Sequence, residues 1–341
     1  MKYIAIDLFS GAGGMSEGLK MAGFETKYAF EIDTIASMTY RLNHDRTKVF
    51  TQDIKTVDTG VIKKSLKGKT VHLLAGCPPC QGFSSMRRLN RNKPVEDERN
   101  SLINEYVRFV NDLRPYTIML ENVPGLAMSE EFRSAIDFLR EIGYNIEYDI
   151  LNVKDYGVPQ SRRRFSLIAT RLNREISLPA KDNTILTVND VLGEKNGFKK
   201  ITAGYKDSTS FAHTTAGLSD VCLRRLAVTP HDGGDRLSWK DNPELQLSCY
   251  IGKDAYFKDT FGRIWWNKPS PTITTKFFSI SNGRFAHPDE DRALSIREGA
   301  TLQTFPKDYE FKTNSIAAAA RIIGNAVPCE YARRLGITII G

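Results

Sequence analysis

The stretch YIAIDLFSGAGG, residues 3–14, joins an apolar run to a glycine-rich turn, and it decides the fold class. Residues 3–9 are almost continuously apolar, which is typical of a buried strand. A helical pattern over residues 15–22 follows the glycines. Such a strand-to-helix turn brings backbone N–H groups close to a ligand. The spacing of Gly11, Gly13 and Gly14 differs from the G-x-G-x-x-G dinucleotide fingerprint, so a structural tight turn and a nucleotide-type site both remain open.

The alternation of strands and helices continues outward from this stretch to about residue 170. Short apolar runs at 28–30, 71–75 and 117–120 predict strands, and residues 106–113 predict a helix. This alternation favours βαβ units. We therefore predict an α/β fold with a doubly wound, mostly parallel sheet. The polar residues of interest follow strand ends, where ligands bind in open α/β sheets.

A change of character after residue 170 predicts a second, smaller domain. Short polar and aromatic segments with frequent Gly, Pro, Asn and Asp replace the βαβ pattern up to about residue 290. Helical patterns return at 293–305 and 316–322. We predict a catalytic and cofactor-binding domain at 1–175, an inserted domain at 176–312, and a segment at 313–341 that returns to the first domain. Two domains of about 150 residues suit the length.

Composition and charge limit the classes of protein to which the chain can belong. With 41% hydrophobic and 26% charged residues, the 341-residue chain is ordinary for a globular protein, which excludes whole-chain disorder or coiled coil. No apolar run reaches ~18 residues and the N-terminus lacks a signal-peptide pattern, so we expect no membrane partner. The net charge of +8 permits a polyanionic partner without identifying one.

The five cysteines are scattered and odd in number, which favours a reducing compartment over a disulfide framework. Cys77 and Cys80 form a C-x-x-C around two prolines, but no second ligand pair follows, so we predict no metal site. GCPPCQGFS places Cys80 in a tight loop after a strand. An inert buried cysteine would sit inside an apolar strand, so this position favours a nucleophile.

Two further motifs suit such a nucleophile. ENVPG puts Glu121 and Asn122 at another strand end, where a carboxyl in a pocket can serve as an acid. QSRRRF, residues 160–165, is predicted to alternate on a strand, with Arg162 and Arg164 on one side. There they could orient Glu121 or bind a base edge or phosphate. A solvated basic edge strand is the alternative.

Two acids extend the possible nucleotide site. Glu31 ends the second predicted strand about 20 residues after the glycines, where an acid can bind ribose hydroxyls. Asp53 could contact an adenine amino group. The alternative for either acid is a solvated loop carboxylate.

Taken together, these motifs closely resemble those of the DNA (cytosine-5) methyltransferases, in the family's order and over almost the whole chain. The resemblance equates GCPPCQGFS with the catalytic-cysteine motif. Five other stretches resemble further family motifs. DLFSGAGG resembles the cofactor loop, ENVPG the acid motif and QSRRRF the Q-x-R-x-R motif. RALSIREGATLQTFP (292–306) and GNAVP (324–328) resemble the last two motifs.

The resemblance implies a Rossmann-like, S-adenosylmethionine-dependent methyltransferase fold. It implies methyl transfer to C5 of a cytosine flipped out of a specific duplex DNA sequence, through a covalent Cys80–C6 intermediate. The stretch of about 120 residues after QSRRRF corresponds to the family's target-recognition region. We expect a monomeric, cytoplasmic, nucleoid-associated protein that acts on double-stranded DNA, with a cognate restriction endonuclease acting separately.

The resemblance also implies residue roles. Cys77 becomes a neighbour without a catalytic role, and Ser84 to Arg99 a loop that closes over DNA, where Ser84 or Ser85 contacts phosphate. Trp265, Trp266 and Arg284 would read the major groove, although an aromatic pair such as Trp265 and Trp266 more often serves in packing than in base contact. The implied catalytic residues are Cys80, Glu121, Arg162 and Arg164, with Arg162 chiefly holding Glu121; the substrate-binding residues are Gln81, Ser84, Asn122 and Gln160; the cofactor-binding residues are Phe9, Ser10, Gly11, Gly13, Gly14, Glu31, Ile32, Asp53, Ile54, Pro79, Leu102, Asn325, Ala326 and Val327.

Two other functions stay open on this scaffold. One is an RNA cytosine-5 methyltransferase acting on tRNA, although the cysteine loop of that branch differs from GCPPCQGFS. The other is a non-catalytic DNA-binding module, against which the retained Cys80, Glu121 and Arg162 argue. A nicotinamide dehydrogenase lacks support because the glycine spacing is wrong.

Overall fold

The computed structural model describes residues 3–79 and 102–340. Its internal contacts divide the chain into two compact units. The first contains the described residues of 1–156, 163–183 and 327–341, and the second contains 157–162 and 184–326. Residues 313–326 thus lie within the second unit, although the sequence grouped them with the C-terminal segment. The predicted domain boundaries stay a prediction.

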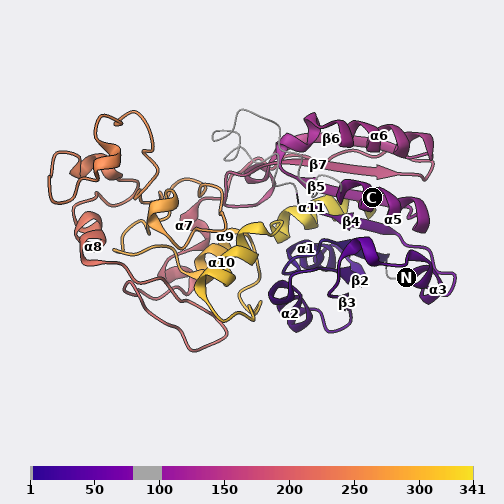
Figure 1. Ribbon diagram of the computed structural model, residues 1–341, viewed down its shortest axis with the longest axis horizontal. Coiled ribbons are helices and arrows are strands. Elements are labelled where there is room, and N and C mark those ends of the chain that lie inside the picture. Colours follow the sequence, from indigo (N-terminus) through magenta and orange to yellow (C-terminus); the bar gives the residue numbers. More distant parts are fainter. Residues whose placement is uncertain (1–2, 80–101, 341) are drawn as a thin grey trace. The chain divides into compact units, whose positions relative to one another are not determined.

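The first unit is built on one twisted sheet (Figure 1). Its strand order is β3-β2-β1-β4-β5-β7-β6, and β7 runs antiparallel to both of its neighbours while β1 to β5 pair in parallel. The predicted doubly wound, mostly parallel sheet is therefore confirmed. The strands span β1 Tyr3–Leu8, β2 Phe24–Phe30, β3 Lys48–Phe50, β4 Leu73–Gly76, β5 Thr117–Asn122, β6 Asn145–Asn152 and β7 Arg163–Thr170.

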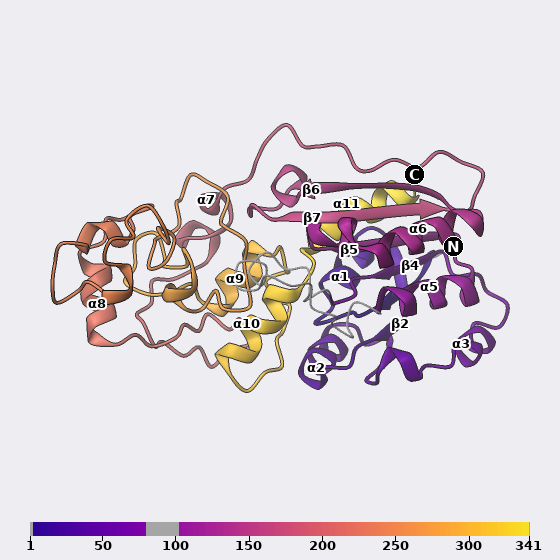
Figure 2. The ribbon, with the colours of Figure 1, turned by 45° about the horizontal axis from the view of Figure 1, so that its top comes forward.

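Helices cover both faces of the sheet (Figures 1 and 2). Alternate strand residues such as Ile6, Ile118 and Leu167 form an apolar core with α3, α5 and α6. The other face carries polar links to two helices that pack together, from Asp7 to α1 and from Ser166 to α11. The helices of this unit span α1 Gly14–Met21, α2 Thr34–Asn43, α3 Thr59–Ser65, α5 Leu102–Leu113, α6 Glu130–Glu141 and α11 Cys329–Ile340.

The strand order reverses between β1 and β4, and this topological switch positions the candidate site. In open α/β sheets, ligands bind beyond the carboxyl ends of the strands at such a point. Phe9 follows β1, Glu31 follows β2, Cys77 follows β4, and Glu121 is the penultimate residue of β5. Four residues singled out in the sequence thus lie along one edge of the sheet.

The second unit contains few regular elements, and buried arginines help to satisfy its backbone. Irregular backbone leaves carbonyl oxygens that need hydrogen-bond donors once they are buried. Arg263, which is fully buried, donates to the carbonyls of Thr229, His287 and Glu290 among others. Arg236 and Arg297 likewise donate to backbone carbonyls. The helices of this unit span α7 Val188–Val191, α8 Asp220–Ala227, α9 Ile296–Leu302 and α10 Ile316–Asn325.

One predicted element needs correction. QSRRRF was expected to form a strand from residue 160 onward, but β7 begins only at Arg163. Gln160 instead bridges to Ser270, and the Ser161 N–H donates to the Ser270 carbonyl at 2.8 Å, so these residues belong to the second unit. The motif therefore crosses from one unit to the other between Arg162 and Arg163.

Candidate active site

The glycine loop after β1 is a compact turn whose backbone conformation requires glycine. Gly11 has φ +54° and Gly13 has φ +93°, and even Phe9 has φ +59°. The loop is closed by hydrogen bonds from the Gly13 N–H to the Ser10 carbonyl and from the Ser10 N–H to the Phe30 carbonyl, both 3.0 Å. A Cβ added at Gly11 would meet no atom of the described residues within 4 Å, so its backbone conformation, rather than crowding, favours glycine.

Glu31 is tied to this loop by its carboxylate. Its Oε2 accepts from the Gly11 N–H at 2.7 Å, and its Oε1 accepts from the Asp33 N–H at 2.8 Å. Burial raises the pKa of Glu31 above its usual value. Because a carboxylate offers about four acceptor positions, each oxygen can accept a further hydrogen bond. Glu31 thus lies beside the glycine loop, and its geometry suits a diol.

A buried series of side-chain hydrogen bonds, which the sequence analysis did not predict, links the elements around the glycine loop. Asp7 is 1% exposed, and burial raises its pKa to about 7. The Ser16 hydroxyl donates to Asp7 Oδ2 at 2.6 Å, and the Tyr40 hydroxyl donates to Ser16 Oγ at 2.6 Å. These bonds connect β1, α1 and α2 directly beneath the glycine loop.

The other predicted cofactor residues of the first unit differ in accessibility. Ile32 is 66% exposed, an unusual state for a large apolar residue beside a strand end. Asp53 caps the turn at Ile54–Thr56 by accepting from the Lys55 N–H at 3.0 Å, and Ile54 itself is buried. The remaining residues comprise half-buried Phe9 and Leu102, buried Ser10, Gly13, Gly14 and Val327, and exposed Pro79.

Glu121 is a deeply buried acid at the sheet edge. It is 1% exposed, and the Cys77 thiol donates to its Oε2 at 3.1 Å. Arg164 Nε lies 3.1 Å from its Oε1, close enough for an ion pair. Among the described residues, however, Oε1 accepts no well-directed hydrogen bond. Glu121 therefore keeps one buried oxygen that a bound molecule could use.

Asn122 fastens the end of β5 to the segment that follows β4. Its side-chain amide donates to the Pro78 carbonyl at 2.8 Å, and its oxygen accepts from the Val123 N–H at 2.8 Å. This anchored segment leads toward the predicted nucleophile. Cys80, Gln81, Ser84, Ser85 and the loop to Arg99 lie outside the described residues, so their roles remain predictions.

Arg162 and Gln160 are engaged within the second unit. Arg162 is 4% exposed and donates to the carbonyls of Ile273 and Gly324 at 3.0 and 3.2 Å, and to the Ala326 carbonyl. Gln160, expected to bind substrate, is fully buried and donates to Gln303 Oε1 at 2.7 Å. The Arg162 contacts hold the C-terminal end of α10 at 324–326, where Asn325 is exposed between buried neighbours.

The two arginines of QSRRRF therefore have different partners. The sequence assigned the holding of Glu121 chiefly to Arg162, with Arg164 in support. The structure places Arg164 against Glu121. The difference arises because β7 begins at Arg163, so Arg164 stays on the sheet face that carries Glu121 while Arg162 leaves the strand.

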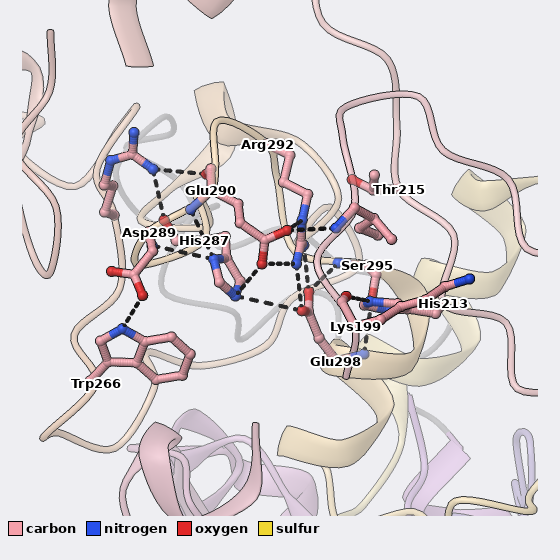
Figure 3. A network of polar contacts seen from close by, with 12 residues as sticks. Lys199, His213, Thr215, Trp266, His287, Asp289, Glu290, Arg292, Ser295 and Glu298 are labelled. Atoms are coloured by element: carbon pink, nitrogen blue, oxygen red, sulfur yellow. Dashed lines mark hydrogen bonds and ion pairs between the residues drawn. The ribbon is translucent and has the colours of Figure 1, made fainter. Parts of the chain in front are cut away.

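A buried ion network in the second unit explains much of the motif RALSIREGATLQTFP (Figure 3). Arg292 donates to both oxygens of Glu298 at 2.8 Å, and Glu290 accepts from the same guanidinium at 3.0 Å. Although burial alone would raise the pKa of Glu298, Arg292 lowers it to about 2. Ser295 and Glu298 also form the capping box of α9. The network is structural.

His287 completes this network as a neutral ring. Its Nδ1 lies 3.1 Å from the Glu290 N–H, which donates to it, so Nδ1 acts as an acceptor. Its Nε2 then carries the hydrogen and lies 3.3 Å from Glu290 Oε1. Burial lowers the pKa of His287 to about 4. Trp266 joins the edge of the network by donating to Asp289 at 2.8 Å (Figure 3).

The expected contact of Arg284 with the major groove is not supported. Arg284 is 5% exposed, and its guanidinium donates to the carbonyls of Gly233 and Arg263 at 2.8 and 3.0 Å. It also lies 4.1 Å from the centroid of the Trp265 ring. Arg284 and Trp265 thus stabilise the unit's interior.

Within the described residues there is neither a cluster of metal-ligand side chains nor a membrane-spanning helix. Residues 3–79 and 102–340 contain no group of three or more His, Cys, Asp or Glu side chains that could hold a metal ion. No helix within these ranges is long and apolar enough to cross a membrane.

Comparison with known proteins identifies the family. The family model described as "C-5 cytosine-specific DNA methylase" matches residues 3–341. The chain belongs to this family.

Individual relatives of this DNA methylase match over nearly their whole length. The Type II methylase M.HgiDII of Herpetosiphon aurantiacus is 32% identical, with 98% of this chain and 94% of that protein covered. The Type II methyltransferase M1.HphI of Haemophilus parahaemolyticus is also 32% identical, covering 100% and 87%. A prophage-encoded DNA modification methyltransferase of Escherichia coli has the same fold, with a TM-score of 0.78, 25% identity and 99% of both chains covered.

Proposed function

We propose that this methylase transfers a methyl group from S-adenosylmethionine to C5 of a cytosine flipped out of duplex DNA, with Cys80 as nucleophile and Glu121 as acid. The observation that carries the proposal is the buried Glu121 carboxylate. It is held by Arg164 at the carboxyl edge of the sheet and retains one oxygen without a well-directed hydrogen bond among the described residues.

The residues around the glycine loop fit the cofactor. Glu31 is oriented by two N–H donors and keeps acceptor capacity for the ribose hydroxyls. Exposed Ile32 offers an apolar surface to an adenine ring, and no atom of the described residues lies within 4 Å of a Cβ added at Gly11. We further propose that Asn325 and Ala326 contact the cofactor from the C-terminal end of α10, which Arg162 holds. When bound, S-adenosylmethionine supplies an electrophilic methyl group on a positively charged sulfur.

The nucleophile solves the central chemical problem, which is that C5 of cytosine reacts poorly with electrophiles. Addition of the Cys80 thiolate to C6 converts the ring into an enamine-like species with a nucleophilic C5. After C5 has been methylated, loss of the C5 proton and departure of Cys80 restore the aromatic ring. The leaving thiolate takes back the electron pair of the S–C6 bond.

Glu121 and Arg164 would stabilise the ring during thiolate addition. Negative charge develops toward N3 and O2 in that step. Glu121, protonated or sharing a proton with N3, neutralises this charge. Arg164 keeps the carboxylate in place from the neighbouring strand and adds positive charge beside it. Burial excludes water from these contacts and strengthens them.

The biological role we propose is protection of DNA in a restriction–modification system, since both relatives named above are called Type II enzymes. The target base is inaccessible within a stacked duplex, so it has to be flipped out at a cost of a few kcal/mol. Arg87, Arg88 and Arg91 in the segment after Cys80 provide positive charge for phosphate contacts.

Bisulfite sequencing of plasmid DNA from cells that express the protein tests the proposal. Methylated cytosines resist conversion, so the wild type is expected to protect one cytosine within one recurring sequence. Cys80→Ser, produced at an equal level, is expected to protect none.

Full conversion with folded wild-type protein would contradict the proposal. Transfer of labelled methyl groups to tRNA but not to duplex DNA would support the alternative function, an RNA cytosine-5 methyltransferase. Protection that persists in Cys80→Ser would remove the nucleophile assignment.

A further inference from the structure

Cys77 lies beside Glu121 because of the register of two parallel strands. Gly76, the last residue of β4, pairs with Leu120 of β5. The next residues along each chain are Cys77 and Glu121, so they are neighbours on the same face of the sheet. The Cys77 thiol donates to Glu121 Oε2 at 3.1 Å.

The backbone around Cys77 is fixed on both sides, which restricts movement of the thiol away from Glu121. The Cys77 N–H donates to the Leu8 carbonyl at 3.3 Å, and the Asn122 amide donates to the Pro78 carbonyl at 2.8 Å. A Cβ at Gly76 would lie 3.0 Å from the Tyr106 ring, so the strand end is also closely packed.

The two carboxylate oxygens of Glu121 differ in their hydrogen bonds. Oε2 accepts its hydrogen bond, whereas Oε1 is buried and accepts no well-directed hydrogen bond among the described residues, although Arg164 Nε lies 3.1 Å away. A buried acceptor without a donor is costly, so such an atom in a site points to a bound molecule that supplies one.

We propose that Cys77 is a positioning residue for methyl transfer: its thiol holds Glu121 Oε2, so that Oε1 faces the hydrogen-bonding edge of the flipped cytosine. This inference rests on the proposed function and replaces the view that Cys77 is a bystander. It predicts that the donor at position 77, rather than the size or the sulfur of the side chain, supports the reaction.

Three variants separate a donor from a space-filler. Cys77→Ala removes the donor, Cys77→Ser keeps a donor of similar size, and Cys77→Thr keeps a donor with an added methyl group. The measurements are kcat, the KM values for duplex DNA and cofactor, and the thermal midpoint Tm. Cys249→Ala and Cys249→Ser serve as matched controls, because Cys249 is an exposed cysteine of the second unit.

Cys77→Ala is expected to lower kcat about 10-fold, because a hydrogen bond to a charged group is lost at the reacting base. Its KM values and Tm should stay near those of the wild type. Cys77→Ser should keep kcat within about threefold of the wild type, and Cys77→Thr should recover most of the loss. The Cys249 variants should keep the wild-type kcat.

Unchanged kcat in Cys77→Ala would overturn the inference. So would equal losses in folded Cys77→Ala, Cys77→Ser and Cys77→Thr, since they would show dependence on the side chain's shape or sulfur. If the wild type itself methylates no DNA, the proposed function fails instead. The two failures are therefore distinguishable.

Discussion

Two buried glutamates, Glu121 in the first unit and Glu298 in the second, show opposite ways of placing a carboxylate inside a protein. Both are 1% exposed or less. Glu298 receives two bonds from Arg292 at 2.8 Å and a third from the Ser295 N–H at 2.7 Å. Glu121 accepts one hydrogen bond from the Cys77 thiol and lies beside the Arg164 guanidinium. Its Oε1 accepts no well-directed hydrogen bond among the described residues.

The difference separates a carboxylate whose contacts are complete within its own unit from one that we propose is kept for a ligand. A buried charge destabilises the folded protein unless it is paired and hydrogen-bonded. Glu298 meets that condition within its own unit. Glu121 meets it only in part, which a protein tolerates where a substrate completes the contacts. Exchanging each glutamate for glutamine should therefore damage different properties.

The largest effect is expected for Glu121→Gln on catalysis. The amide cannot supply an acidic proton to the ring, so kcat should fall by about 10²- to 10⁴-fold. The free energy of unfolding should stay within about 1 kcal/mol of the wild-type value, since the wild-type carboxylate is already incompletely paired. Methyl-transfer kinetics and chemical denaturation check both parts. A comparable loss of stability would place Glu121 among the structural residues.

Glu298→Gln should give the reverse result. It leaves Arg292 buried with Glu290 as its remaining carboxylate partner among those shown in Figure 3. We expect a loss of about 3 kcal/mol in the free energy of unfolding, near the lower end for breaking a buried pair. Activity per folded molecule should change little at low temperature. Wild-type stability in this variant would show that the network of Figure 3 is dispensable.

The pH dependence of stability sharpens the contrast, because His287 and Glu298 titrate in different windows. Burial lowers the folded-state pKa of His287 to about 4 from 6.5. The unfolded chain therefore binds the extra proton first, and stability falls as pH decreases from 6.5 toward 4, by about 3 kcal/mol. For Glu298, with a folded-state pKa of about 2 against 4.5, the loss comes only below pH 4.5.

Denaturation of the wild type and His287→Gln across this pH range measures the effect. The wild-type curve should fall between pH 6.5 and 4, and the variant should be flatter there. Parallel curves for the two proteins would show that His287 does not titrate as described.

The smallest expected effects are those of lysine substitutions at the two arginines of QSRRRF, Arg162 and Arg164. Arg162→Lys should lower the free energy of unfolding by about 1 to 3 kcal/mol, because a lysine cannot serve three carbonyls as a guanidinium does. Arg164→Lys should instead lower kcat with little change in stability. If Arg162→Lys were stable and Arg164→Lys were not, the assignments would have to be exchanged.

Much of the first unit was predictable from sequence, because local pattern and topology agree there. The apolar runs gave strands, and the polar residues after them met at one edge since parallel strands end together. Glu31 beside the glycine loop followed from this logic. The contact of Cys77 with Glu121 could have been found in the same way, because both residues follow directly from adjacent strand ends.

The second unit was far less predictable. Its backbone is irregular, and its order depends on arginines that reach carbonyls distant in sequence, such as Arg263 with Thr229. Such contacts leave no periodic trace. Arg284 resembled a DNA-binding residue for this reason, since an arginine in a polar segment gives no sign of burial. Likewise, nothing in QSRRRF indicates that the strand begins after Arg162.

Covalent trapping on DNA tests the central proposal most directly. Duplex DNA with 5-fluorocytosine at the target position cannot lose its C5 substituent as a proton, so elimination of the cysteine is blocked. With S-adenosylmethionine present, the wild-type protein should form an adduct that survives denaturing electrophoresis, whereas Cys80→Ser should form none. An enzyme that methylates ordinary DNA but yields no adduct on this substrate would contradict covalent catalysis at the sheet edge.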